Sequence, residues 1–125
     1  MVATDFESER AYDEQRFSAR TIFESPRMKV VLGYFEPGQF IPVHAPASDV
    51  TMAVQSGSAV VRDGDDEHDV NPGDVVVIDA GTKRGIRADD ERMEALLVTA
   101  PPPTDEEHDP VRTGIRENTF DPGAE

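Results

Sequence analysis

The pattern of hydrophobic and polar positions divides the 125 residues into three parts. Between residues 17 and 100, short runs rich in valine, isoleucine, threonine and phenylalanine alternate with turns of glycine, proline and aspartate. The runs cover residues 20–23, 28–36, 40–43, 50–55, 59–62, 74–78, 84–87 and 93–99. None is long enough for a helix, and their spacing is typical of an antiparallel sandwich or barrel. The pattern therefore predicts an all-β domain over residues 17–100.

Local features refine this prediction. The sequence Asp63-Gly64-Asp65 between two runs predicts a hairpin turn. Four consecutive apolar residues at 75–78 predict a strand that is buried on both faces. Residues 1–16 are polar and predict an arm or a short helix. Residues 101–125 begin with three prolines and are acidic, with only Val111, Ile115 and Phe120 available to pack. They predict an extended tail that lies along the domain or along a partner subunit.

Charge and cysteine content exclude several classes of protein. The chain has no cysteine, which excludes disulfide frameworks, zinc knuckles, iron–sulfur clusters and thiol nucleophiles. Its net charge of −14 should repel nucleic acid and anionic membrane surfaces. No apolar run approaches membrane-spanning length and the N-terminus is acidic, so we expect a cytoplasmic protein. Among 12 basic residues only Lys29 and Lys83 are lysine, which suggests adaptation to a salt-rich cytoplasm.

Two glycine-framed stretches resemble the two conserved motifs of the cupin superfamily. In residues 38–57, Gly38 is followed after five residues by His44, and Gly57 closes the stretch. In residues 73–88, Gly73 is followed after seven residues by Gly81. Glycine at such positions supplies the positive φ that sharp barrel corners require. The resemblance covers roughly residues 20–100. It implies a cupin jelly-roll barrel, an antiparallel double sheet, flanked by the polar arm and the C-terminal tail.

The metal ligands of the family are mostly missing. The resemblance implies two histidines, a glutamate and a third histidine as ligands of a divalent metal. The first position holds His44, but the other three hold Pro46, Val50 and Arg84. Proline and valine have no side-chain donor atoms, and arginine stays cationic. We therefore expect no cofactor; a divalent transition metal would need His44 and Asp49, and alternation along a strand turns Asp49 to the other face.

The barrel model also predicts which side chains line an interior pocket. They are His44, Val50, Met52, Val54 and Arg84. A buried arginine needs a partner, which is either an anionic ligand or an internal carboxylate such as Asp49 or Asp79. His68 lies in an acidic loop and is expected to be solvated, and Arg87 is expected at the surface. His108 lies among acidic residues of the tail, which could collect a metal only loosely.

Three functional hypotheses follow. The first is a small-molecule-binding cupin with an Arg84- and His44-lined pocket for an anion, without a tightly bound metal, in a sensor or accessory role. Any catalysis would be acid–base chemistry by His44. The second is a metal-dependent dioxygenase or isomerase with an unorthodox site that uses His44. The third is a structural or interaction module with a filled barrel. Cupins commonly pair through their sheets, and the apolar run 28–35 would suit a homodimer interface.

Overall fold

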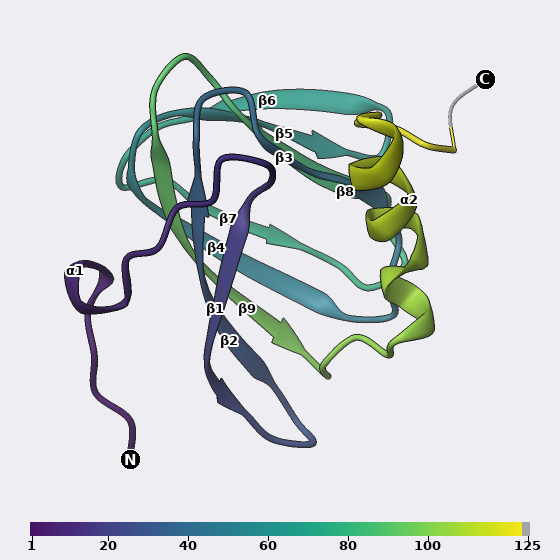
Figure 1. The fold of residues 1–125 in the computed structure, drawn as a ribbon. Coiled ribbons are helices and arrows are strands. Elements are labelled where there is room, and N and C mark those ends of the chain that lie inside the picture. Colours follow the sequence, from purple (N-terminus) through teal and green to yellow (C-terminus); the bar gives the residue numbers. More distant parts are fainter. Residues whose placement is uncertain (124–125) are drawn as a thin grey trace.

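The computed structural model describes residues 1–123 and confirms the all-β architecture. Within this part of the chain, nine strands form two facing antiparallel sheets in a jelly-roll arrangement (Figure 1). The larger sheet has the order β1-β2-β9-β4-β7, and the smaller one β3-β8-β5-β6. The strands are β1 (Ser18–Glu24), β2 (Lys29–Phe35), β3 (Phe40–His44), β4 (Asp49–Ser56), β5 (Ala59–Asp63), β6 (Asp66–Val70), β7 (Val75–Ile78), β8 (Arg84–Ala88) and β9 (Met93–Ala100).

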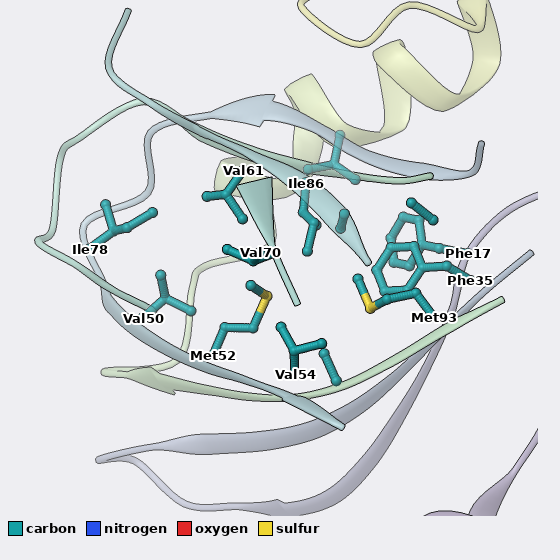
Figure 2. Packing of buried hydrophobic residues seen from close by; sticks show 14 residues of the cluster. Phe17, Phe35, Val50, Met52, Val54, Val61, Val70, Ile78, Ile86 and Met93 are labelled. Atoms are coloured by element: carbon teal, nitrogen blue, oxygen red, sulfur yellow. The ribbon is translucent and has the colours of Figure 1, made fainter. Parts of the chain in front are cut away.

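Alternation along the strands creates the hydrophobic core between the sheets. In β4, the side chains of Val50, Met52 and Val54 point inward, while Thr51 and Gln55 are exposed. Figure 2 shows these three side chains facing Val61 and Ile86 of the smaller sheet, among other members of one buried cluster. The core is thus closed by apolar side chains of both sheets.

Strand β7 differs from the prediction that it is buried on both faces. It is the outer strand of the larger sheet, paired only with β4 in the described residues. Val75 and Val77 are 65% and 66% exposed, whereas Val76 and Ile78 face the interior. A run of four valine and isoleucine residues cannot distinguish a central strand from an edge strand, because both bury at least one face. The predicted turn at Gly64 is confirmed as the connection between β5 and β6.

The N-terminal arm lies against the outer face of the larger sheet. After the short helix α1 (Phe6–Glu9), the Tyr12 hydroxyl donates a hydrogen bond to the buried Glu94 carboxylate at 2.6 Å. The Arg10 guanidinium donates to the same carboxylate at 2.6 and 3.2 Å. The Tyr34 hydroxyl donates to the Phe6 carbonyl at 2.8 Å. Burial alone would raise the pKa of Glu94. The hydrogen bonds from Arg10 and Tyr12 more than offset that effect, so the pKa of Glu94 lies below its usual range.

The C-terminal segment is helical rather than extended, and it packs on its own domain. A 3₁₀ turn (Glu106–His108) leads into helix α2 (Asp109–Glu117), which lies beside β3 (Figure 1). Val111 enters the hydrophobic core, and Ile115 packs against it. Gly114 permits this approach, because a Cβ there would lie 2.5 Å from Pro42. No helix of the described residues is both long and apolar enough to cross a membrane.

Candidate functional site

A cavity of about 180 Å³ opens between the two sheets near the ends of β3 and β8. Its apolar wall includes Val50 and Met52 of β4, Leu97 of β9, and Val61 and Ile86 of the smaller sheet. Four basic side chains also line it: Lys29, His44, Arg84 and His108. Among residues 1–123, no aspartate or glutamate lines it, although the chain has 26 acidic residues. The cavity is therefore a basic, largely apolar site in a strongly acidic protein.

Arg84 begins strand β8 and lines this cavity. The residue is only 5% exposed, and it forms no ion pair with any residue between 1 and 123. Its Nη1 atom is buried without a hydrogen-bond partner among those residues. Burial lowers the pKa of Arg84, and the nearby charges of Asp49 and Glu107 act against that shift. A guanidinium nevertheless stays protonated in a protein, so this is a buried positive charge with unused donors.

His44 is the direct cross-strand partner of Arg84. Its Nδ1 lies 3.0 Å from the carbonyl oxygen of Pro42. A carbonyl can only accept, so Nδ1 carries the proton of this hydrogen bond. Burial lowers the pKa of His44, and the positive charge of Arg84 adds to the effect. The imidazole is therefore neutral at pH 7, with its proton on Nδ1 and a lone pair on Nε2.

A second pair of basic groups, Lys29 and His108, belongs to the same cavity. Lys29 begins β2 on the larger sheet, and His108 comes from the C-terminal segment. Burial lowers the pKa of His108, and the charge of Lys29 lowers it further. His108 also lowers the pKa of His44, so the two imidazoles are near one another. His108 is thus a pocket residue and is only partly exposed.

The C-terminal segment is held at this end of the barrel by hydrogen bonds. The Glu107 carboxylate accepts from the backbone N–H of Ala47 at 2.5 Å and from that of Thr104 at 2.8 Å. The buried Ser48 hydroxyl donates to the Pro101 carbonyl at 2.6 Å. These contacts fix the chain on both sides of Pro103 and His108, which line the cavity.

Other residues singled out in the sequence lie elsewhere. Val54 belongs to the closed part of the core and does not line the cavity. Asp49 is exposed, and its carboxylate accepts from the backbone N–H of Ala80 at 2.8 Å. Asp79 and His68 are also exposed. Arg87 lies over the Phe120 ring, 5.1 Å from its centroid, outside the cavity.

Residues at the metal-ligand positions of the related motifs do not fit a metal. Pro46 and Val50 are buried without donor atoms, and the fourth position holds Arg84, which lines the cavity. Within residues 1–123, no group of three or more histidine or acidic side chains is arranged to hold an ion. A divalent cation here would face a fixed positive charge and at most two imidazoles, fewer protein ligands than such ions need.

Lys29 and His108 are basic residues of the pocket that the sequence did not predict. The spacing of the glycine motifs carried no signal for either, because one lies before the first motif and the other after the second. Lysine is scarce in this chain, and one of its two lysines lines the cavity.

Comparison with known proteins supports the fold throughout the barrel. A family model described as a cupin domain matches residues 31–99. Among curated proteins, no sequence matches the chain. A protein from Thermus thermophilus is similar in structure, with a TM-score of 0.78 and 31% identity over 82% of this chain and 100% of its own. An RmlC-like cupin from Desulfovibrio desulfuricans has a TM-score of 0.73 and 30% identity over 82% and 98%. A Klebsiella pneumoniae protein with a double-stranded β-helix domain has a TM-score of 0.74 and 22% identity over 79% and 89%.

Proposed function

This chain belongs to the cupin family, and from that premise we propose that it binds a small organic anion in the cavity lined by Arg84 and His44, without a tightly held metal. The role is that of a sensor or accessory protein. The family fold alone does not select a ligand, because one fold hosts many functions. The ligand class is therefore inferred from the side chains that line the cavity.

One observation carries the proposal: Arg84 is a buried guanidinium with unused donors, in a cavity that no carboxylate of the described residues lines. Burying a charge without a partner is costly, since the protein cannot replace the lost hydration. A carboxylate or phosphate group would supply the opposite charge and accept two hydrogen bonds from the planar guanidinium. The apolar wall of Met52, Ile86 and Leu97 would then contact the rest of the molecule.

Two alternatives are less well supported. A metal-dependent dioxygenase or isomerase would use His44 with Asp49, but the Asp49 carboxylate is exposed and bonded to the Ala80 backbone. A structural module with a filled barrel would have no cavity, whereas this barrel contains one of about 180 Å³. That volume suits a small metabolite, because drug-sized ligands occupy roughly 300–1,000 Å³.

The test is a thermal-shift screen of small carboxylates and phosphates against matched uncharged amides and alcohols. We expect stabilisation by some of the anions and by none of the uncharged analogues. Arg84→Gln should abolish the effect, because it removes the charge but keeps a polar side chain. Arg20→Gln, which removes an exposed charge from β1, is the control and should leave the effect unchanged. Equal stabilisation of the wild type and Arg84→Gln would overturn the proposal.

We also propose that two copies pair through the outer face of the larger sheet. Cross-strand partners form one uncharged row across all five strands: Val77, Thr51, Val98, Val30 and Phe23. Val77 is 66% exposed and Phe23 is 41% exposed. In a two-fold dimer each patch contacts the same patch on the other copy. Because each chain has a net charge of −14, the repulsion between two copies is weakest where the contacting patch carries no charge. Most of the expected interface at 28–35 is buried within the chain, and only its beginning contributes.

Oligomeric state tests this second proposal. Light scattering coupled to gel filtration should give the mass of a dimer for the wild type. Val77→Asp should give a monomer, because it places like charges opposite each other in the interface. His68→Asp, on an exposed position of β6 in the other sheet, should remain a dimer. A monomeric wild type at all accessible concentrations would contradict the proposal.

A further inference from the structure

We propose that the ligand is a small aliphatic 2-hydroxy acid, whose carboxylate binds Arg84 and whose hydroxyl group donates a hydrogen bond to Nε2 of His44. This inference rests on the proposed function and adds the chemical class of the ligand. Its premise is that the paired residues Arg84 and His44 differ in kind: one is a donor that carries charge, and the other is a neutral acceptor.

The donor side of the site is Arg84. Its buried Nη1 has no partner among residues 1–123, and a guanidinium has five N–H donors and no acceptor. It therefore selects an acceptor group with negative charge. A carboxylate fits best, because its two oxygens match the two parallel N–H bonds of the guanidinium.

The acceptor side is His44. Because Nδ1 donates to the Pro42 carbonyl at 3.0 Å, the remaining ring nitrogen of the neutral imidazole is Nε2, which can only accept. A second carboxylate oxygen would meet this lone pair with its own lone pair, which is repulsive. A hydroxyl group of the ligand can donate to it. The neutral state is consistent with the lowered pKa of His44 in this buried position.

Strand pairing places these two side chains next to each other. His44 and Arg84 are directly opposite on β3 and β8, and the Cβ atoms of such partners are roughly 4.5–5.5 Å apart. Two side chains that start side by side and line one cavity suit a ligand that carries its carboxylate and hydroxyl on neighbouring carbon atoms. The apolar residues Val61, Ile86 and Met52 extend the wall from this point, so the third substituent is expected to be a short hydrocarbon chain.

A second basic pair, Lys29 and His108, also affects which ligand the cavity binds. Lys29 comes from the larger sheet, whereas Arg84 and His44 come from the smaller one. Lys29 and His108 line the same cavity, and no acidic residue of the part of the chain that the structure describes lines it beside them. Lys29 adds positive charge at the site without competing for the hydroxyl donor. It therefore strengthens the preference for an anion and leaves the choice of hydroxyl to His44.

Calorimetric titration tests the inference with both enantiomers of 2-hydroxybutanoate and with butanoate, 2-methoxybutanoate and 2-hydroxybutanamide. We expect one enantiomer of 2-hydroxybutanoate to bind about tenfold more tightly than butanoate or 2-methoxybutanoate, neither of which can donate. The amide should bind at least tenfold more weakly than the hydroxy acid, because it lacks the charge. In His44→Phe, 2-hydroxybutanoate and butanoate should bind with about equal affinity. In His68→Phe, the tenfold preference for the hydroxy acid should remain.

The outcomes distinguish failure of the hydroxy-acid inference from failure of the proposed anion site. Equal wild-type affinity for 2-hydroxybutanoate and butanoate, both lost in Arg84→Gln, would overturn the hydroxy-acid inference and leave the anion site standing. Affinities that are unchanged in Arg84→Gln would overturn the proposed function itself. Failure of every compound to bind at millimolar concentration would overturn the hydroxy-acid inference, while the wider anion screen decides the proposed function separately. The wild-type ratio of affinities decides the inference even if a His44 variant fails to fold.

Discussion

His44 and Arg84 lie opposite each other on β3 and β8, and no carboxylate of the described residues forms an ion pair with that arginine. In the related motifs these two positions hold metal ligands, so the same backbone geometry here presents a donor and an acceptor instead. The barrel keeps its cavity while the chemistry of the cavity changes. A buried charge without a partner lowers the stability of the free protein, and this cost has a measurable consequence.

Replacing Arg84 with methionine should stabilise the free protein. Methionine fills a similar volume beside Met52 and Ile86 without a charge to desolvate. Exchange of buried charges for apolar groups is often neutral or stabilising, and we expect a gain of about 1–3 kcal/mol in the free energy of unfolding. Urea denaturation without ligand measures this gain, and the same variant should lose all anion binding.

The matched control for that experiment is Arg62→Met. Arg62 is paired with Asp121 at 3.0 Å and Glu67 at 3.5 Å, and it lies over the Phe120 ring. Its replacement should destabilise the protein, because it removes contacts that hold the C-terminal segment. A comparable loss of stability in both variants would mean that Arg84 has a structural role.

Much of the fold was predictable because its causes are local. Alternation in β4 and the turn at Gly64 are visible in the sequence, and both were confirmed. Helix α2 was not predicted, because Asp109–Glu117 contains only two apolar residues besides its glycine and proline. Its stability comes from packing of Val111 into the core and from the fit of Gly114 against Pro42, which are long-range contacts.

The site was predictable only in part, for a related reason. His44, Val50, Met52 and Arg84 could be placed because strand alternation and the glycine frame fix their direction. His108 arrives from a segment whose path depends on Glu107 binding the Ala47 backbone, some 60 residues earlier in the chain. No local pattern carries that information. Strand alternation also cannot tell Val54 from Val50, because both face inward and only the position along the barrel separates core from cavity.

Gly114→Ala should destabilise the C-terminal segment even though alanine favours helices. Propensity alone would add about 0.5–1 kcal/mol of stability. A Cβ at this position, however, would lie 2.5 Å from two atoms of Pro42 and 2.7 Å from the Thr119 carbonyl oxygen. We expect a net loss of about 1–3 kcal/mol, as for other overpacked sites.

The exposed neighbour Arg116→Ala provides the comparison for that helix variant, since it changes propensity without a close contact. Its stability should change by no more than about 0.5 kcal/mol. Limited proteolysis should cleave residues 101–121 faster in Gly114→Ala than in Arg116→Ala. A Gly114→Ala protein that is more stable than the wild type would show that the helix can shift without cost.

Stability should rise with potassium chloride. The net charge of −14 creates repulsion that salt screens, because the Debye length falls from about 10 Å at 0.1 M to about 3 Å at 1 M. We therefore expect the melting temperature to increase steadily between these concentrations. Sucrose of equal osmolality separates screening from general solute exclusion and should have a smaller effect. Equal melting temperatures at low and molar salt would contradict adaptation to a salt-rich cytoplasm.

The contact between Tyr12 and Glu94 should make the docking of the N-terminal arm depend on pH. The pKa of Glu94 is lowered in the folded protein from a usual value of 4.5. Its contribution to stability is therefore complete above about pH 4.5 and is lost as the pH falls through the folded-state pKa. Tyr12→Phe removes the 2.6 Å hydrogen bond but keeps the ring, and it should cost about 1–2 kcal/mol at pH 7. That deficit should shrink as the carboxylate becomes protonated.

Tyr34→Phe is the control, because it removes the same hydroxyl group from a neutral acceptor, the Phe6 carbonyl at 2.8 Å. Its deficit should stay constant between pH 3 and pH 7, since no titrating group of that hydrogen bond changes charge in this range. Urea denaturation of the wild type and both variants across these pH values measures the difference. If the Tyr12→Phe deficit is also independent of pH, the docking of the arm depends on the packing of Tyr12 against Tyr34 and Arg92, and the ionised Glu94 contributes little to it.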